Sequence, residues 1–304
     1  MLSRACESIK YRNNIYHEEN QYLNLLEDIL SNNNEFIGRN GKTLSVYGSA
    51  MHFSLENNKI PLITTKKVAW KTCLKELLWF IKGDTNNKLL KQQNVHIWDA
   101  NGSREFLDSQ GLYNNDEDDL GPIYGFQWRH FNADYETCNS DYYNKGIDQL
   151  SDVIKTLKDP KLRNSRRMII SAWNPCQLNK MALPPCHIMM QFNVSNNKLS
   201  CSMYQRSNDE ACGTCFNIAS YSFLTHLLAH HCDLEPYEFI YYKGNCHIYQ
   251  EHIDTIKIQL QREPYEFPNL KIINKRENIE DYKLEDFIVS NYKHHDQLEY
   301  KMVA

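Results

Sequence analysis

The segment LPPCH at 183–187 holds the first candidate for chemistry, because its cysteine, Cys186, directly follows two prolines. Proline keeps the chain stiff and extended, which suits a side chain presented as a nucleophile. Alternating apolar residues over 186–194 and 199–205, joined by an Asn-Asn turn, predict a β-hairpin that brings Arg206 towards Cys186. A nearby guanidinium lowers the pKa of a thiol and raises its thiolate fraction. Covalent catalysis and an ordinary buried strand cysteine are therefore about equally supported.

Several arginines in short motifs could together bind a phosphate. Arg206 is followed by Ser207 at the end of the predicted hairpin. Arg166 and Arg167 adjoin a predicted β run, and Arg39 lies in the glycine-containing loop GRNG. Forked guanidinium groups with a serine hydroxyl suit a phosphate monoester. Each arginine taken alone is better explained as a solvated surface residue, so the phosphate site depends on their convergence near the cysteine.

Other polar residues have two interpretations each. Glu76 lies in a strongly apolar segment, where a carboxylate is either paired for structural reasons or has a raised pKa and an acid/base role. His187 follows the cysteine directly, but strand neighbours point to opposite faces, which argues against a cysteine–histidine pair. The sequence CGTC at 212–215 and the i,i+4 pair His226 and His230 are weak redox or metal signals without a second motif.

Composition limits the classes of function. The 304 residues include 34 Lys and Arg against 38 Asp and Glu, a net charge of −4, which does not favour a protein that binds nucleic acid through its phosphates. No apolar run reaches the roughly 18 residues of a membrane span, and the N-terminus lacks a secretory signal pattern. Ten scattered cysteines fit a reducing compartment better than a disulfide framework. We expect a cytoplasmic location, with nuclear entry left open, and no DNA or membrane partner.

The elements that must position these residues follow from hydrophobic periodicity. The pattern predicts helices over 22–30, 70–82, 149–157, 217–232 and 249–260. It predicts the hairpin and further strands over 43–55, 167–173 and 238–242, with the HIY sequence at 247–249 just after the last strand. Helices and strands mix without a break, so we expect one α/β (α+β) domain over 1–304.

Long strings of residues, met in order, carry a family resemblance. They are TTKK at 64–67, ELLWF at 76–80, IWD at 97–99, DLGPIYGFQWR at 119–129, ALPPCH at 182–187, YQRS at 204–207, FNIASY at 216–221 and HIY at 247–249. Together they resemble the folate-dependent thymidylate synthase family, from about residue 38 to residue 271 and again at the C-terminal tail.

The resemblance implies reductive methylation of dUMP to dTMP, with 5,10-methylenetetrahydrofolate giving both the carbon and the hydride. Cys186 would add to C6 of the uracil and make C5 nucleophilic. Glu76 would direct proton traffic at O4 and the folate. Tyr124, with Asn101 and His130 around it, would help to remove the C5 proton. The family needs no metal and no flavin.

The resemblance also implies the binding residues. The phosphate of dUMP would be held by Arg39, Arg206 and Ser207, and from a second subunit by Arg166 and Arg167. Asn217 would read O4 and N3–H of the uracil, His247 and Tyr249 would hold the ribose, and Gln205 and Asp209 would line the same site. The folate would lie against Ile97, Trp98, Asn101, Asp209, Gly213 and Phe216, under a tail that ends at Ala304.

The fold that the family implies is a large twisted mixed sheet with helices on one face. Two copies would pack sheet to sheet as an obligate homodimer. Residues 1–37 would form an N-terminal extension and helix, and 285–304 a tail that closes over the folate. Because only about 37 residues precede the matched region, we expect no fused dihydrofolate reductase domain.

Three departures from the family pattern concern binding. The loop after Arg39 is one residue shorter than usual, and the chain ends in Val-Ala, where relatives often end in Ala-Val. Cys212 and Cys215 replace a leucine and a proline in the folate-side loop. Loss of a proline costs up to about 1 kcal/mol through the entropy of the unfolded chain. We therefore expect weakened folate affinity with the nucleotide chemistry intact.

Two other functions stay open at this stage. A pyrimidine hydroxymethylase of the same superfamily would use water in place of the hydride. Its dCMP-specific form is disfavoured because Asn217 suits uracil, whereas the dUMP form is not excluded. A non-catalytic regulatory paralogue would have lost catalytic residues, and none are lost here.

Overall fold

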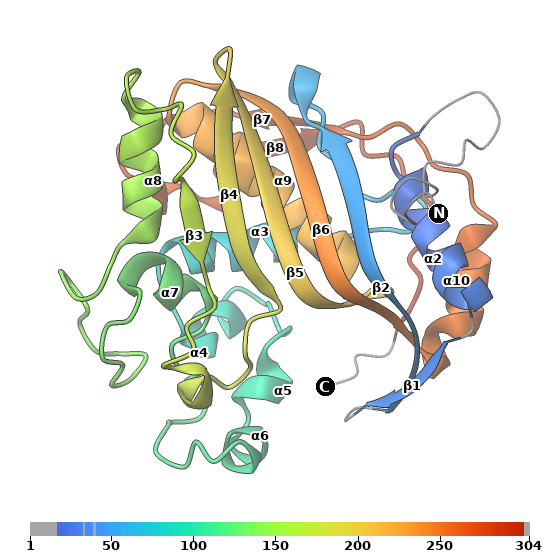
Figure 1. The fold of residues 1–304 in the computed structure, drawn as a ribbon, viewed down its shortest axis with the longest axis horizontal. Coiled ribbons are helices and arrows are strands. Elements are labelled where there is room, and N and C mark those ends of the chain that lie inside the picture. Colours follow the sequence, from blue (N-terminus) through green and yellow to red (C-terminus); the bar gives the residue numbers. More distant parts are fainter. Residues whose placement is uncertain (1–16, 33, 39–40, 301–304) are drawn as a thin grey trace.

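The computed structural model describes residues 17–32, 34–38 and 41–300. A six-stranded mixed sheet forms its centre (Figure 1), in the order β1-β2-β6-β5-β4-β3. β5 and β6 are parallel and the other neighbours are antiparallel. The strands are β1 Glu35–Gly38, β2 Gly41–Ser54, β3 Ile169–Ser171, β4 His187–Ser195, β5 Lys198–Asp209 and β6 Glu235–Tyr249. A separate pair, β7 Asn269–Ile272 and β8 Phe287–Ser290, is antiparallel.

Helices and short turns connect and cover the sheet. The α-helices are α2 Asn20–Asn32, α3 Trp70–Ile81, α4 Asn87–Lys91, α5 Asp99–Gly102, α6 Arg104–Ser109, α7 Tyr124–His130, α8 Gln149–Lys158, α9 Gly213–His231 and α10 Ile253–Leu260. The 3₁₀ turns are Glu56–Asn58, Leu178–Lys180, Gln250–His252, Ile279–Asp281 and Leu284–Asp286. Over the described residues, no helix has the length and apolar character that crossing a bilayer requires.

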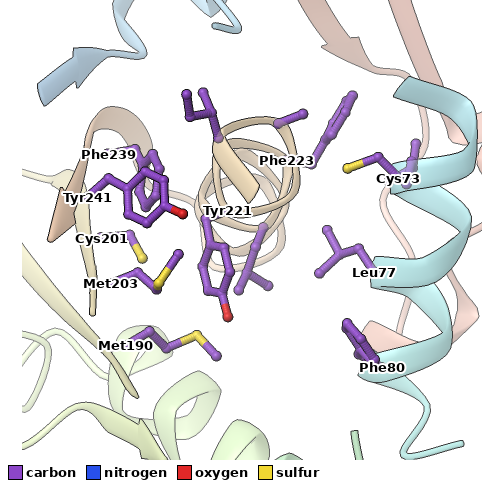
Figure 2. Close-up of a cluster of buried hydrophobic side chains, with 14 of the residues drawn as sticks. Cys73, Leu77, Phe80, Met190, Cys201, Met203, Tyr221, Phe223, Phe239 and Tyr241 are labelled. Atoms are coloured by element: carbon purple, nitrogen blue, oxygen red, sulfur yellow. The ribbon is translucent and has the colours of Figure 1, made fainter. Parts of the chain in front are cut away.

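The central helix α9 is apolar on nearly all sides, as expected for a helix buried between two layers. Figure 2 shows it between the sheet and α3, with Tyr221 on the helix facing Met203 and Tyr241 from the strands. The rings of Tyr221 and Phe239 stack at 5.9 Å. This core supports the ends of β4 and β5, where the candidate site lies.

Among the described residues, no helix covers the opposite face of the sheet (Figure 1). Tyr242, Tyr204 and Met189 lie side by side across β6, β5 and β4. Tyr242 is 46 % exposed and Met189 40 % exposed. The predicted mixed sheet with helices on one face is therefore confirmed, and its other face carries large apolar side chains.

The predicted helices and strands are largely confirmed, with three corrections in two regions. The strand predicted over 238–242 extends over Glu235–Tyr249, so the HIY sequence ends the strand and does not follow it. The helix predicted over 249–260 is a 3₁₀ turn followed by α10. Pairing with β2 on one side and β5 on the other satisfies the backbone of β6 even where its residues are polar or glycine. The β run predicted over 167–173 is shorter, at Ile169–Ser171.

Candidate active site

The predicted hairpin places Cys186 and Arg206 together, as expected. Arg206 N donates to the carbonyl of Cys186 at 2.9 Å. The guanidinium of Arg206 donates to the carbonyls of Pro185 at 2.9 Å and Pro184 at 3.0 Å. Its carbon also lies 5.6 Å from the ring centre of Trp173. The prolines before the cysteine thus orient the arginine as well as the chain, a role that sequence reasoning missed.

Two opposing effects act on the thiol of Cys186. Burial raises its pKa, and the positive charge of Arg206 lowers it. Burial is the larger effect, so the pKa of Cys186 lies above its ordinary value. The expected influence of the arginine on the thiol pKa is confirmed, and burial, which the sequence does not show, outweighs it. A protein without its substrate therefore keeps this sulfur mainly as a thiol at neutral pH.

A chain of contacts joins Cys186 to Glu76. Cys186 N donates to the hydroxyl of Tyr124 at 2.8 Å, and the rings of Tyr124 and Trp98 lie 6.0 Å apart. Trp98 Nε1 donates to Glu76 Oε1 at 2.7 Å. Burial raises the pKa of Glu76 to about 7, although the hydrogen bond from Trp98 opposes this shift. Over the described residues, no lysine or arginine pairs with Glu76, so the proton-transfer interpretation is favoured over structural pairing.

His187 contacts Tyr221 on α9, and over the described residues no hydrogen bond joins its ring to Cys186, which agrees with the strand alternation. Its Nδ1 lies 2.6 Å from the hydroxyl of Tyr221 on α9, and its ring stacks on Tyr124 at 4.2 Å. Burial lowers the pKa of His187 to about 3, so the ring is neutral. It holds Tyr124 in place and does not act as a base for the neighbouring cysteine.

An amide pair lies at the start of α9. Asn217 Nδ2 donates to Gln205 Oε1 at 2.7 Å, and Gln205 is buried. The hydroxyl of Tyr241 also donates to Gln205 Oε1. Asn217 itself is only partly buried, so its carbonyl and its second N–H can meet a ligand.

The parallel pairing of β5 and β6 gathers further predicted residues at one edge of the sheet. Asp209 is in register with His247, and Ser207 lies two residues before it. His247 Nδ1 is 2.9 Å from Asn245 Oδ1, and its ring is 5.3 Å from that of Tyr249. Strands that run in parallel end at the same edge of a sheet, which is why Asp209 and His247, 38 residues apart in sequence, meet here.

Two of the residues predicted to face the folate, Gly213 and Phe216, lie in the first turn of α9. A Cβ at Gly213 would lie 2.7 Å from Asn208 Oδ1, so any larger residue would have to displace the amide of Asn208. Phe216 is partly buried, and its carbonyl accepts from Cys73 Sγ at 3.3 Å. Ile97 packs partly against the core, next to the buried Trp98. A Cβ at Gly213 would also lie 3.9 Å from Asn217 Nδ2, so Gly213 lies next to the amide pair.

The CGTC sequence forms the entry to α9. Cys215 is buried in the first helical turn and Cys212 precedes it, and both thiols are free. Asp209, Cys212 and His252 each bring one donor atom within 4.8 Å of the others. Asp209 Oδ1, however, already accepts the backbone N–H groups of Ala211 and Cys212 at 2.9 and 3.4 Å.

Some predicted residues are not joined to this group. His130 packs on Phe126 at 5.6 Å and Tyr142 at 5.8 Å, in a small separate cluster. In the part of the chain that the structure describes, no hydrogen bond links His130 or Asn101 to Cys186, Tyr124 or Glu76. The roles of His130 and Asn101 therefore stay predictions. Arg166 and Arg167 are exposed beside β3. Two further predicted residues lie outside the described residues: Arg39 and Ala304.

Comparison with known proteins identifies the family of this chain. The sequence profile of the family described as thymidylate synthase matches residues 20–304. The chain is 52 % identical to thymidylate synthase of Homo sapiens over 289 residues, which cover 95 % of this chain and 91 % of that protein. It is 50 % identical to the bifunctional dihydrofolate reductase-thymidylate synthase of Plasmodium chabaudi over 299 residues, and 51 % identical to that of Zea mays over 290.

The coverage differs between these relatives. The matches cover 98 % and 95 % of this chain but only 50 % and 55 % of the two bifunctional proteins, so the chain spans about half of their length. Because the family profile covers nearly all of the chain, and the human protein is matched over most of its length, the chain belongs to the thymidylate synthase family.

Proposed function

We propose that this protein converts dUMP to dTMP, with 5,10-methylenetetrahydrofolate as the donor of carbon and hydride and dihydrofolate as the second product. The observation that carries the proposal is the contact chain from Cys186 through Tyr124 and Trp98 to Glu76. It joins a nucleophile to a carboxyl group that can exchange a proton near neutral pH.

Cys186 would form a bond to C6 of the uracil, and the ring electrons would move to C5 and O4. The thiol would give up its proton to water as this bond forms, and the positive charge of Arg206 favours the attacking thiolate against the opposing effect of burial. Glu76 would relay a proton to and from O4 and the folate. The folate supplies the carbon that C5 attacks and then the hydride that completes the methyl group.

Tyr124 would help to remove the proton from C5 of the bound nucleotide. Its hydroxyl already accepts from the backbone of Cys186, so it lies beside the point of attack. Burial and the nearby Cys186 raise the pKa of Tyr124 well above its usual value. The hydroxyl is therefore protonated and would pass the proton on through water, with Asn101 and His130 as predicted neighbours.

The nucleotide would lie along the edge formed by β5 and β6. Arg206 and Ser207, with Arg39, would hold its phosphate, and His247 and Tyr249 its ribose. Asp209 and Gln205 would complete this site. Asn217 would face the uracil with one acceptor and one donor, which matches N3–H and O4.

The folate would bind over the start of α9, against Ile97, Trp98, Gly213 and Phe216. The C-terminal segment supports a closing tail over this position. Tyr300 lies over Lys66 Nζ at 4.3 Å, and Lys66 donates to the carbonyl of Ala211 in the folate-side loop. We propose that 285–304 closes the site and that 1–304 acts as one catalytic domain. The reaction needs no metal or flavin.

We also propose a homodimer in which the open sheet faces meet and each site receives Arg166 and Arg167 from the partner. The exposed apolar side chains of that face and the exposure of both arginines support this. Mixing the two inactive variants Cys186→Ala and Arg166→Ala should restore activity, because one site in the mixed dimer is then intact. Sedimentation as a monomer, or no recovery of activity on mixing, would contradict the homodimer.

A cytoplasmic location remains a prediction from cysteine usage.

The test of the reaction follows the absorbance rise of dihydrofolate when the protein meets dUMP and methylenetetrahydrofolate. We expect a rise that disappears in Cys186→Ala. Release of tritium from C5 of dUMP without that rise would mean that water replaces the hydride, and a hydroxymethylase would then be the better assignment. The absence of both signals, the absorbance rise and the tritium release, would refute the enzymatic proposal.

A further inference from the structure

A fully buried ion pair lies behind the base-binding end of the site. Lys243 Nζ on β6 donates to Glu210 Oε2 at 2.8 Å, and both side chains are 0 % exposed. Removing two charges from water is costly and is often not repaid by their attraction. The proposed reaction uses neither residue. A contribution to stability therefore does not explain why this buried ion pair is present.

Hydrogen bonds connect this pair to Asn217. Asn208 Nδ2 donates to Glu210 Oε1 at 3.4 Å and to the hydroxyl of Thr214, which in turn donates to Glu210 Oε2 at 2.5 Å. Asn208 Oδ1 accepts from Gln205 Nε2 at 2.9 Å. Gln205 Oε1 then accepts from Asn217 Nδ2 at 2.7 Å. Two amide side chains thus lie between the carboxylate and Asn217.

Tyr241 joins the same groups from the sheet. Figure 2 shows it projecting from the strand with its hydroxyl towards α9. The hydroxyl donates to Gln205 Oε1 at 2.5 Å and accepts from Asn208 Nδ2 at 2.9 Å and Asn217 Nδ2 at 3.4 Å. Burial and the carboxylate of Glu210 raise the pKa of Tyr241 well above its usual value, so it retains the proton that it donates.

The carboxylate gives this chain of amides a direction. A carboxylate only accepts hydrogen bonds, so Asn208 presents its NH₂ group to Glu210 and its carbonyl to Gln205. Gln205 then turns its NH₂ group to Asn208 and its carbonyl to Asn217. The backbone carbonyl of Ser207 accepts from Gln205 Nε2 at 2.9 Å and reinforces this orientation. Asn217 therefore points one N–H inward and offers a carbonyl and a second N–H to the ligand.

We propose that the Glu210–Lys243 ion pair is a specificity device that acts through Asn208 and Gln205 to fix the amide of Asn217 for uracil and against cytosine. Uracil offers a donor at N3 and an acceptor at O4, whereas cytosine offers an acceptor and a donor. Cytosine would require the reversed amide, which would set the carbonyl of Asn217 against that of Gln205. Glu210 and Lys243 are positioning residues, and the inference rests on the proposed function for the identity of the base.

The test is the double variant Glu210→Gln with Lys243→Met, which removes both charges together. We expect the ratio of the dCMP and dUMP dissociation constants to fall by about tenfold, equivalent to about 1.4 kcal/mol. A neutral amide at 210 can face Asn208 with either end, so position 210 no longer imposes the direction of the chain, and only the carbonyl of Ser207 still favours it. Thr214→Val keeps the ion pair and removes one hydroxyl, and should shift the ratio less, in the same direction.

The matched control is Arg276→Met with Asp286→Asn. It removes another ion pair with a buried carboxylate, at 2.6 Å, whose hydrogen-bond partners share no residue with this network. We expect its dCMP to dUMP ratio to equal that of the wild type. Thermal unfolding of every variant identifies the folded ones, and Thr214→Val decides the question if the double variant does not fold.

The outcomes separate the two proposals. An unchanged ratio, or an equal weakening of both nucleotides, would overturn the inference and leave a structural role for the ion pair. A wild type that binds dUMP selectively but does not turn it over would refute the proposed reaction and leave the binding test in force. A wild type that binds both nucleotides equally would refute the inference itself.

Discussion

Replacement of Glu76 by glutamine should make the protein more stable at alkaline pH while removing its activity. Burial raises the pKa of Glu76 from 4.5 to about 7. The unfolded chain therefore releases this proton near pH 4.5, and the folded chain retains it until about pH 7. Between these values the unfolded state binds fewer protons, so the free energy of unfolding decreases as the pH rises.

The size of the effect follows from the shift. The pKa of Glu76 differs by about 2.5 units between the folded and unfolded states, and each unit corresponds to about 1.36 kcal/mol. Ionisation of Glu76 therefore lowers the free energy of unfolding by about 3 kcal/mol between pH 4.5 and a pH above 7. A side chain that never ionises has no such loss. Glutamine is such a side chain, and its oxygen can still accept from Trp98 Nε1. Any cost of its extra N–H groups is the same at every pH. The quantity to compare is therefore the pH dependence of the stability difference between the two proteins.

The assay is urea unfolding of wild type and Glu76→Gln at pH 5, 6, 7 and 8, at one fixed protein concentration. The advantage of the variant should grow across this range and level off near pH 8. Turnover of dUMP should be lost in the same variant, as expected where a site carries a destabilising group for function. A stability difference that is constant from pH 5 to 8 would refute the assignment of a raised pKa to Glu76.

Asp286→Asn is the control of opposite sign. Burial raises the pKa of Asp286, but hydrogen bonds from Arg276, Asn274 and the backbone of Lys283 outweigh it and bring the pKa to about 2. This carboxylate therefore stabilises the fold above its unfolded pKa of 3.8, and the stabilisation is lost as the pH falls towards 2. The variant should be about 2 kcal/mol less stable than the wild type throughout pH 5 to 8.

Three further predictions follow from single contacts. Arg206→Met should slow alkylation of Cys186 by iodoacetamide at pH 7.5, because the charge that lowers the thiol pKa is removed; an unchanged rate, measured by mass spectrometry of that peptide, would contradict it. Cys215→Pro should lower the KM for the folate, because proline is tolerated in a first helical turn and stiffens the loop; an unchanged KM would count against this account. Gly121→Ala should cost about 3 kcal/mol or more in urea unfolding, since Gly121 has φ +73° and a Cβ would lie 2.0 Å from the carbonyl of Lys180; a loss below about 1 kcal/mol would refute the clash.

Periodicity alone predicted the parts of the fold that depend on a single segment. The alternation on either side of the Asn-Asn turn predicts β4 and β5, and it therefore predicts that Arg206 approaches Cys186. The apolar character of 217–232 predicts the buried helix α9. Both signals are local, because a hairpin and a helix each form from neighbouring residues. The long strand β6 was only partly predicted, since its polar residues are stabilised by partners far away in sequence.

Local sequence patterns do not predict the hydrogen-bond network behind Asn217. Lys243 interrupts the apolar alternation of β6, and in isolation it indicates an exposed position or an edge strand. It becomes a buried cation only because β5 and β6 pair in parallel and the chain after β5 turns Glu210 towards it. No periodicity encodes that register. A lysine and a glutamate that break an apolar pattern next to a recognised binding motif are nevertheless a usable signal, since a buried charge needs a partner and the partner must also lie near the site.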